Sequence, residues 1–214
     1  MSRLIKIQKP KYIDELKEIV DLKNEFIYED NIVNKSLSNE TIEGKNDTAI
    51  TIDSCIFTNV IFDNCSFDRV DLLDTKFINC DLSNVSFTGG SIHRVEFINC
   101  KLIGSRFDEC SIKDVLFQNN LCKYSNFSGS KFRCANIIDC NLADGVFQEV
   151  QLNKVVFSEC NLANCYFNKT SLSKQDLTTC DITNIDVEIK DLYGIKVTAM
   201  QALDLTRLMG LHIV

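Results

Sequence analysis

The 214-residue chain has no Trp, one Pro, eight Gly and only two His. Gly and Pro are too few for a β protein built from tight hairpins, because hairpin turns depend on these residues. His93 and His212 follow no metal-ligand spacing, and the Cys residues form no CxxC pair. We also find no Ser-His-Asp arrangement, phosphate-binding glycine loop or HExxH motif. The sequence therefore predicts a protein that is not an enzyme and uses no metal or cofactor.

Long apolar runs are missing as well. Residues 1–10 contain no apolar stretch typical of a signal peptide, and no segment is long enough to cross a membrane. The cytoplasm is therefore the expected location, and a membrane is not an expected partner. With 45% hydrophobic residues and a net charge of −7, the composition is typical of a single folded domain.

What the chain does have is a period of five. From Ile52 to Leu192 every fifth residue is apolar, the smallest being Cys122, and the phase never shifts. We call these the central positions, and they hold thirteen of the fourteen Phe residues. A fixed period over most of a chain is typical of stacked-repeat proteins.

Neither a helix nor a flat strand keeps residues five apart on one side. Five residues turn a helix by about 500°, and in a strand they point to opposite faces. The chain must therefore turn a corner about once per repeat, so that four corners close a coil of about twenty residues. The residue two before each central position is usually Cys, Val, Ser or Thr, and we call these the small positions.

Nine of the eleven Cys residues occupy small positions. We interpret them as buried free thiols, used as small apolar residues, rather than as disulfides or zinc ligands. Some of them, such as Cys80 and Cys100, are expected to stack within bridging distance. The nine residues are Cys55, Cys65, Cys80, Cys100, Cys110, Cys140, Cys160, Cys165 and Cys180.

Units such as Cys80–Asn84, Ser125–Gly129 and Cys160–Asn164 resemble the repeat of the pentapeptide-repeat family: a small residue, Asp or Asn, Leu or Phe, and two polar residues. The resemblance covers about two thirds of the chain. It implies an all-β solenoid, specifically a right-handed quadrilateral β-helix over residues 50–192, with coils about 4.8 Å apart.

Steps of twenty residues sort the central positions into four columns. Phe fills one column from Phe67 to Phe167 and most of the opposite column, which begins at Phe57. Rings stacked at strand spacing attract one another, so two aromatic columns are expected in the core. An outward column of Asn also predicts a ladder of side-chain amides at one corner: Asn59, Asn79, Asn99 and Asn119.

Residues 1–49 depart from this pattern and are expected to cap the open end of the solenoid. The spacing of apolar residues predicts an amphipathic helix at about 12–28. A degenerate first coil is expected at about 32–49, where Asp47 interrupts the phase. A local irregularity is also expected at 120–122, where both inward positions depart from the pattern.

The repeat is expected to stop after Leu192, and residues 193–214 to form a helix and a tail. Thr198 and Gln201 have the spacing of a capping box, and Gly210 is placed to end the helix. This helix either caps the solenoid or joins two copies in a homodimer, as its resemblance to the C-terminal helix of Qnr- and MfpA-type pentapeptide-repeat proteins implies. The residues assigned to a dimer interface are Met200, Leu203, Leu208, Met209, Leu211 and Ile213.

Charge is unevenly distributed along the chain. Residues 93–138 hold seven basic and four acidic side chains, whereas residues 139–192 hold nine acidic and four basic ones. Acidic residues are expected at the outward positions of any such repeat, but those in the second block could also form a partner-binding surface. The candidates are Asp139, Asp144, Glu149, Glu159, Asp176, Asp181, Asp186 and Asp191.

The Qnr and MfpA resemblance implies a non-enzymatic mimic of DNA that binds DNA gyrase or topoisomerase IV and modulates fluoroquinolone sensitivity. The unbroken phase leaves no room for the projecting loops of typical Qnr proteins, so the loop-free, MfpA-like form is the closer match. The basic residues of 93–138 argue against simple mimicry. The alternative is a protein-interaction scaffold with another cytoplasmic partner, for which outward Ile78, Ile98 and Ile138 could form a contact stripe. Direct binding of nucleic acid is not expected.

Overall fold

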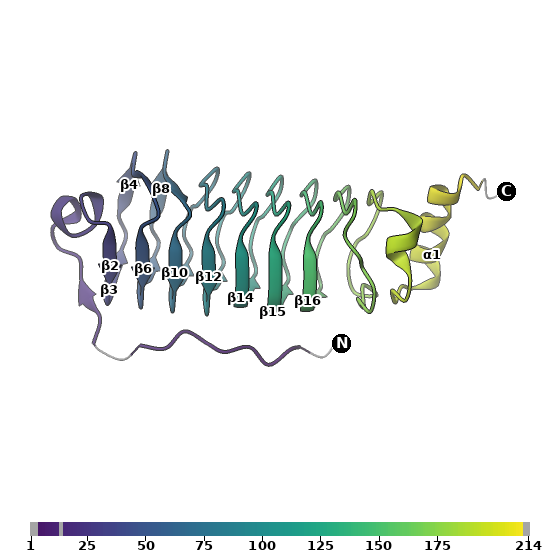
Figure 1. Cartoon of the computed structure of the whole chain (residues 1–214), viewed down its shortest axis with the longest axis horizontal. Coiled ribbons are helices and arrows are strands. Elements are labelled where there is room, and N and C mark those ends of the chain that lie inside the picture. Colours follow the sequence, from purple (N-terminus) through teal and green to yellow (C-terminus); the bar gives the residue numbers. More distant parts are fainter. Residues whose placement is uncertain (1–3, 13–14, 212–214) are drawn as a thin grey trace.

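The computed structural model describes residues 4–12 and 15–211, and it is a β-solenoid of about seven turns with a short helix at its C-terminal end (Figure 1). Residues twenty apart pair in parallel: Leu72, for example, lies between Ile52 and Ile92. Four five-residue edges therefore make one coil, as the period predicts. The all-β solenoid fold is confirmed.

Two of the four edges carry most of the regular strands. The first edge holds β2 (Asn31–Val33), β6 (Thr51–Asp53), β10 (Asp71–Leu73) and β12 (Ser91–His93). The second edge holds β3 (Lys35–Ser38), β7 (Ile56–Thr58), β11 (Lys76–Ile78) and β13 (Glu96–Ile98). Three longer strands run through the corner between these edges: β14 (Ser111–Gln118), β15 (Lys131–Ile138) and β16 (Gln151–Ser158).

The third and fourth edges have regular strands only near the N-terminal end. The third edge begins with β4 (Thr41–Glu43) and β8 (Ile61–Asp63), and the fourth with β5 (Asn46–Thr48) and β9 (Ser66–Asp68). Later coils pair on these edges through single bridges, such as Ile61 with Asp81. The stacking of coils therefore continues there with less regular backbone.

A residue in the left-handed backbone conformation turns nearly every corner. Asn59 and Asn79 both have φ near 55°, and their N–H groups donate to the carbonyls of Ile78 and Ile98 in the next coil (2.9 Å each). Asn and Asp tolerate this conformation better than other non-glycine residues, which explains their recurrence two residues after the central positions. One step of the predicted amide ladder is confirmed, because Asn79 Nδ2 donates to Asn59 Oδ1 (3.3 Å). Asn59 Nδ2 also donates to Asn39 Oδ1 (2.9 Å), a step that was not predicted.

The central residues fill the axis of the rod. Phe57, Phe77 and Phe97 stack with ring centroids 5.1 Å apart at each step. The opposite column meets them edge-on, as when Phe97 and Phe107 contact at 5.9 Å and 82°. The two predicted aromatic columns are therefore present, and together they combine stacked and T-shaped geometry, both of which are favourable.

The small inward residues satisfy polar backbone atoms as well as filling space. Ser105 Oγ donates to the carbonyl of Leu82 (2.7 Å), and Cys110 Sγ donates to that of Phe87 (3.0 Å). Each of these carbonyls also accepts the backbone N–H three residues further on, so the side chain supplies its second hydrogen bond. The thiols and hydroxyls of the small positions therefore serve as donors as well as small residues.

The predicted irregularity at 120–122 is absent, because the side chain of Asn120 adapts to the coil. Cys122 is buried at its central position. Asn120 fills a small position, where its Oδ1 accepts the N–H of Cys100 (2.7 Å) and its Nδ2 donates to the carbonyl of Phe97 (2.9 Å). One amide thus joins two coils without changing the backbone path.

The prediction of a helix at about 12–28 is wrong for the residues that the structure describes. Residues 13–14 lie outside the described part of the chain. In place of the helix, β1 (Lys17–Glu18) pairs with β3, and a single π-helical turn, η1 (Lys23–Ile27), follows it. Phe26 in this turn is fully buried against the aromatic core. The segment that suggested a helix instead adds one short strand to the sheet and inserts the ring of Phe26, which covers the open end of the solenoid.

The first coil keeps its shape around a buried charge. Lys45 is buried, and its Nζ donates to the carbonyls of Ile27 and Glu29 (3.1 and 3.0 Å). The same Nζ lies 2.5 Å from Asp47 Oδ2. Asp47 therefore occupies a central position as the counter-ion of Lys45, which explains why an acid interrupts the apolar series there.

Residues 4–12 form an extended segment, which we call the strap, that runs back along the rod (Figure 1). Lys11 N–H donates to Asp74 Oδ1 (2.9 Å) and Gln8 N–H to Asp114 Oδ1 (3.1 Å), and both carboxylates are buried. Three extended residues span about 10 Å, which matches two coil spacings of about 4.8 Å. The strap and the solenoid are therefore in register.

The strap is also held at its N-terminal end. Ile5 N–H donates to Asn136 Oδ1 (3.0 Å), and the carbonyl of Ile5 accepts from Asn136 Nδ2 (2.8 Å). Asn136 is buried on β15, so its amide pairs with the strap as a backbone group of a neighbouring strand would.

Asp74 is the charged anchor of the strap. Burial opposes ionisation of its carboxyl, but hydrogen bonds from Arg94 (2.6 and 2.5 Å) and from the Lys11 N–H outweigh burial and lower the pKa of Asp74. A lowered pKa means that the charged form favours docking at pH values above about 4. The contribution is lost as the pH falls through the lowered pKa.

The coil continues slightly beyond Leu192, where the pattern was expected to stop. A 3₁₀ segment, η2 (Ile189–Leu192), is followed by Lys196, whose N–H donates to the carbonyl of Gln175 (2.8 Å). Val197 packs against the core. The last half coil thus lacks the repeat consensus but keeps the twenty-residue spacing.

The C-terminal helix begins as predicted. It comprises α1 (Ala199–Leu205) and a 3₁₀ turn, η3 (Thr206–Met209). Thr198 and Gln201 form the predicted capping box, with hydrogen bonds of 3.2 and 2.7 Å. Gly210 ends the helix with φ of 70°, a conformation that glycine adopts without strain.

We expect Asp74→Asn to loosen the strap. Asn keeps an acceptor for Lys11 N–H but loses the charge, and hydrogen bonds to charged groups are stronger than neutral ones by about 1 kcal/mol. Tryptic cleavage after Lys11 should therefore become about fivefold faster in the folded protein. Asp63→Asn, which removes an exposed charge elsewhere, is the control. Equal cleavage rates in Asp74→Asn and the wild type would contradict an anchoring role.

Candidate partner-binding surfaces

The acidic residues predicted as a partner surface surround the rod instead of gathering on one face. Consecutive repeats occupy consecutive edges, so acids five residues apart point in four directions. Asp139 and Glu159, at corners twenty residues apart, stack in one column. We call the eight residues together the acidic belt. One member lies on each edge of the same coil: Asp176, Asp181, Asp186 and Asp191.

Basic side chains neutralise part of this belt. Lys169 Nζ lies 2.8 Å from Glu149 Oε1, and this contact lowers the pKa of Glu149. Lys123 Nζ lies 3.7 Å from Asp144 Oδ2. Asp191 is half-buried, and its Oδ2 has no hydrogen-bond partner among the described residues. These three acids therefore contribute less negative charge to the surface than the sequence suggests.

Of the remaining acids, Asp176 is half-buried and lies 4.0 Å from Lys196 Nζ, and the others are exposed. Local hydrogen bonds hold two of them in place. Asp181 Oδ1 accepts from the N–H (2.9 Å) and the hydroxyl (2.6 Å) of Thr183, and Asp176 accepts from Thr178 in the same way. Such turns fix a carboxylate relative to the backbone. The belt is thus a set of charges with defined positions on a rigid rod.

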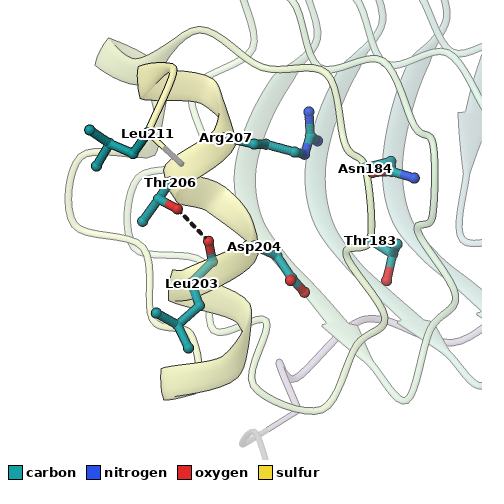
Figure 2. A pocket seen from close by; sticks show the side chains of 7 residues that line it. All are labelled: Thr183, Asn184, Leu203, Asp204, Thr206, Arg207 and Leu211. Atoms are coloured by element: carbon teal, nitrogen blue, oxygen red, sulfur yellow. Dashed lines mark hydrogen bonds between the residues drawn. The ribbon is translucent and has the colours of Figure 1, made fainter. Parts of the chain in front are cut away.

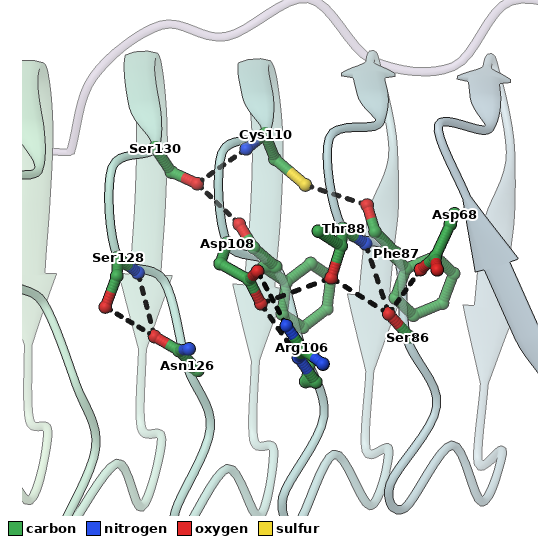
Figure 3. A network of polar contacts seen from close by, with 11 residues as sticks. Asp68, Ser86, Phe87, Thr88, Arg106, Asp108, Cys110, Asn126, Ser128 and Ser130 are labelled. Carbon is green, nitrogen blue, oxygen red and sulfur yellow. Dashed lines mark hydrogen bonds and ion pairs between the residues drawn. The ribbon is translucent and has the colours of Figure 1, made fainter.

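On the fourth edge, charged side chains outside the acidic belt form hydrogen bonds with one another and with neighbouring hydroxyls (Figure 3). Asp68 accepts from Ser86 Oγ (2.5 Å), and Thr88 Oγ1 donates to Asp108 (3.2 Å). Arg106 forms two hydrogen bonds with Asp108 (3.0 and 2.9 Å). The carboxylates are used within the network, so this cluster serves the stability of the edge.

The C-terminal helix has one face on the solenoid. Gln201 Nε2 donates to the carbonyls of Leu177 and Cys180 (2.9 and 2.7 Å), and Arg207 donates to the carbonyl of Ile185. Leu208, which the sequence assigned to a dimer interface, is half-buried and packs partly against the core of its own chain.

The other face of this helix is apolar and exposed. Figure 2 shows Leu203 and Leu211 pointing away from the solenoid, whereas Asp204 and Arg207 point toward Thr183. The exposed fractions are 70% for Met200 and 62% for Met209. Ile213 lies outside the described residues. Apolar side chains gathered in this way at one end of a rod are typical of an interaction surface.

Tyr193 and Ile189 extend this apolar area beyond the helix, with 85% and 54% of their surfaces exposed. We call Ile189, Tyr193, Met200, Leu203, Met209 and Leu211 the terminal face. Its members surround the end of the rod, next to the acidic belt, so a protein bound at one surface is close to the other.

The buried thiols are chemically protected. All nine Cys residues of the small positions are buried and unbridged, as predicted, and Cys134 is half-buried. Burial raises the pKa of Cys55, Cys110 and Cys165 to about 12. A thiol with a raised pKa has little of the nucleophilic thiolate form at neutral pH. The described residues include no group of His, Cys, Asp and Glu that could hold a metal ion.

None of the helices in the described part of the chain has the length and apolar character required to span a membrane.

Comparisons with known proteins support the architecture. The family described as "Pentapeptide repeat region" matches residues 50–127 and 70–144, and "Pentapeptide repeats (8 copies)" matches residues 146–184. Curated protein sequences give no significant match. A solved structure of trypsin-treated QnrB1, described as a plasmid-mediated fluoroquinolone resistance protein, is 24% identical, with 84% of this chain and 90% of that chain covered and a TM-score of 0.50.

A second solved structure is more distant. HetL, a pentapeptide-repeat protein involved in heterocyst differentiation regulation from the cyanobacterium Nostoc sp. strain PCC 7120, is 14% identical, with 78% of this chain and 86% of that chain covered and a TM-score of 0.37. At these identities the QnrB1 structure supports the fold alone, and the HetL structure adds no further argument.

We expect native protein treated with iodoacetamide near neutral pH to be alkylated quickly at Cys134 alone. The other ten thiols are buried, so the reagent does not reach them in the native state. Mass spectrometry of the intact protein measures the number of adducts, and the same treatment after guanidinium unfolding should add one to every Cys. Rapid labelling of Cys110 or Cys165 in the native state would refute this interpretation of the core.

Proposed function

Because the chain belongs to the pentapeptide-repeat family, we propose that it acts without catalysis, as a rigid DNA-like rod that binds a type II topoisomerase. The observation that carries this proposal is the acidic belt, whose members project from all four edges of the last coils. Duplex DNA likewise presents phosphate charge around its circumference. A basic surface that accepts DNA could accept such a rod.

The dimensions of the rod support the same proposal. Seven coils about 4.8 Å apart make a cylinder roughly 35 Å long. Stacked strands and a filled core make it stiff, so its charges keep their spacing as those of a duplex do. Two rods joined end to end would be roughly 70 Å long, with their acidic belts near the middle.

The terminal face provides the means to join two rods, and we propose that it forms a homodimer. Met200, Leu203 and Met209 are exposed at the end of the molecule, where a twofold axis would bring each against its copy. Leu208 does not take part, because it packs on its own solenoid.

The choice of DNA gyrase as target, and of fluoroquinolone sensitivity as the affected property, follows the similarity in fold to QnrB1, a fluoroquinolone resistance protein. The phase of five is unbroken, which leaves the rod without projecting loops. We propose that the belt itself, and no loop, contacts the enzyme, in the cytoplasm where gyrase acts.

A protein-interaction scaffold is the second candidate, and one observation favours it. Ile78 pairs with Ile98 on the second edge, and Ile138 lies in the same column, with Gln118 between. These Ile side chains are half-buried and outward. A partner that recognises this stripe would bind in a manner insensitive to salt, whereas binding through the belt would weaken as salt rises.

We expect micromolar protein to change the supercoiling activity of purified gyrase, with and without ciprofloxacin. In Asp176→Asn/Asp181→Asn/Asp186→Asn the effect should need about tenfold more protein, because three charge contacts near the surface contribute roughly 0.5 kcal/mol each. Asn keeps the acceptor for each local hydrogen bond, so the fold is preserved.

The matched control is Glu43→Gln/Asp63→Asn/Asp71→Asn, which removes three exposed acids at the other end of the rod and leaves the same net charge. It should behave as the wild type does. If gyrase is indifferent to the wild-type protein, or if both triple variants lose the effect equally, the belt is not a mimic of DNA.

We expect the wild type to sediment as a dimer and Met200→Glu/Leu203→Glu as a folded monomer. Both side chains are exposed, so charge there should disrupt only contacts between copies. Val20→Glu, at an exposed apolar residue near the opposite end, is the control and should remain dimeric. A wild type that stays monomeric at high micromolar concentration would leave the terminal face without this role.

A further inference from the structure

The seven basic residues of 93–138 fall into two groups in the structure. Four of them make ion pairs across or within coils. The pairs are Arg94 with Asp74, Lys101 with Asp81, Arg106 with Asp108 and Lys123 with Asp144. The other three, Lys113, Lys131 and Arg133, make no ion pair with any residue in the described ranges. The excess positive charge of the block therefore resides in these three side chains.

Strand register brings the three together on the first edge. Lys113 on β14 lies directly opposite Arg133 on β15, and Lys131 lies opposite Ser111. The next residue in the Lys113 column is His93, whose pKa is lowered by burial and by the charges of Arg94 and Lys113. Like charges directly opposite each other destabilise a sheet. The rod thus carries a local electrostatic cost at this place.

No carboxylate among residues 4–12 and 15–211 forms an ion pair with any of these three cations. Asp114 follows Lys113 in sequence, but its Oδ1 accepts from the Gln8 N–H of the strap and its Oδ2 lies 3.7 Å from His93 Nε2. On the opposite side, β16 contributes Gln151 and Asn153, which are neutral. An anion in solution is therefore the group that the arrangement lacks.

The same residues line a shallow cavity of about 240 Å³ on β14, β15 and β16, three neighbouring strands in Figure 1. Most of its lining side chains can donate hydrogen bonds, and none is acidic. Those that can donate are Ser111, Lys113, Lys131, Arg133, Gln151 and Asn153. A donor-rich, acid-free cavity fits a ligand that has several acceptor oxygens and negative charge.

We propose that this cavity on the first edge binds a small phosphate compound through Lys113, Lys131 and Arg133. The guanidinium group matches two phosphate oxygens at once, and each ammonium group adds a compact charge. Lys113 and Arg133 lie on neighbouring strands about 4.8 Å apart, a backbone spacing that suits two linked phosphoryl groups better than one. The site is separate from the acidic belt and does not depend on the topoisomerase proposal.

Free phosphate compounds are favoured over nucleic acid as the source of the phosphoryl group. The chain has a net charge of −7, and a long polyanion must approach its acidic edges as well as the cavity. A small ligand such as pyrophosphate meets only the three cations. The cavity accommodates such a ligand but not a duplex.

Titration calorimetry with pyrophosphate, at ionic strength held constant with sodium chloride, tests the proposal. The wild type should bind one pyrophosphate with a saturable heat and should melt at a higher temperature in its presence. Lys113→Gln/Lys131→Gln/Arg133→Gln should bind about tenfold more weakly or worse. Without ligand the same variant should melt at or above the wild-type temperature, because like-charge repulsion is relieved.

The matched control is Lys101→Gln/Lys123→Gln/Lys169→Gln, which removes three exposed lysines from ion pairs elsewhere on the rod. It should retain wild-type affinity. Equal weakening in the two variants would assign the heat to net charge and overturn the site, as would a wild type with no saturable heat. If the triple cavity variant fails to fold, Lys131→Gln alone provides the same comparison.

A short DNA duplex, titrated under the same conditions, separates the two sources of phosphate. We expect weaker binding of the duplex than of pyrophosphate. Tighter binding of the duplex, lost in the cavity variant, would support the phosphate site and assign it to nucleic acid. Duplex binding that survives in the cavity variant while pyrophosphate gives no heat would overturn the proposal.

Discussion

The whole structure depends on a corner that the chain turns once every five residues. The corner residue adopts the left-handed backbone conformation, which costs a non-glycine residue roughly 1 kcal/mol or more. A hydrogen bond to the next coil offsets this cost, as when the N–H of Asn59 donates to the carbonyl of Ile78. The central side chain reaches its neighbours only when coils are stacked. The corners and the core therefore stabilise each other. One isolated coil would lack both the hydrogen bonds at its corners and the contacts of its central side chains, so it would not be stable.

Much of the fold could be predicted because residues at a fixed spacing in the sequence occupy equivalent places in successive coils. The Phe columns and the capping box at Thr198 required only that spacing and local chemistry. The strap could not be predicted, since Asp74 and Asp114 look like any other corner Asp until a segment more than sixty residues away reaches them. The prediction of an N-terminal helix was wrong because pairing of this segment with the open edge of the sheet outweighed the helical pattern of its apolar residues.

The candidate surfaces also combine features that the sequence predicts with features that it does not. The sequence located the acids of the belt on separate edges, because edge assignment follows from the period alone. Ion pairing was not predictable: Lys101 and Lys131 look alike in sequence, but register places one beside Asp81 and the other beside Ser111. Leu208 likewise has the spacing of its exposed neighbours on the C-terminal helix, yet it covers the last coil.

The difference between paired and unpaired cations also explains how a rod with basic residues in its middle can still act through negative charge. Four of the seven cations are neutralised by carboxylates of the same or the adjacent coil, so the remaining positive charge is confined to the cavity around Arg133. About two and a half coils, or roughly 12 Å, separate that cavity from Asp181 in the belt. The Debye length at physiological salt is about 8 Å, so the cavity and the four acids of that last coil are largely screened from each other, whereas Asp139 and Asp144 lie within one coil of the cavity. A partner that recognises the four acids of the last coil therefore meets negative charge that the cavity does not cancel, and those acids do not expel an anion from the cavity. One rigid rod can present both surfaces because its inward thiols and hydroxyls form hydrogen bonds with the backbone carbonyls of the interior. The outward residues are therefore not needed to stabilise the core.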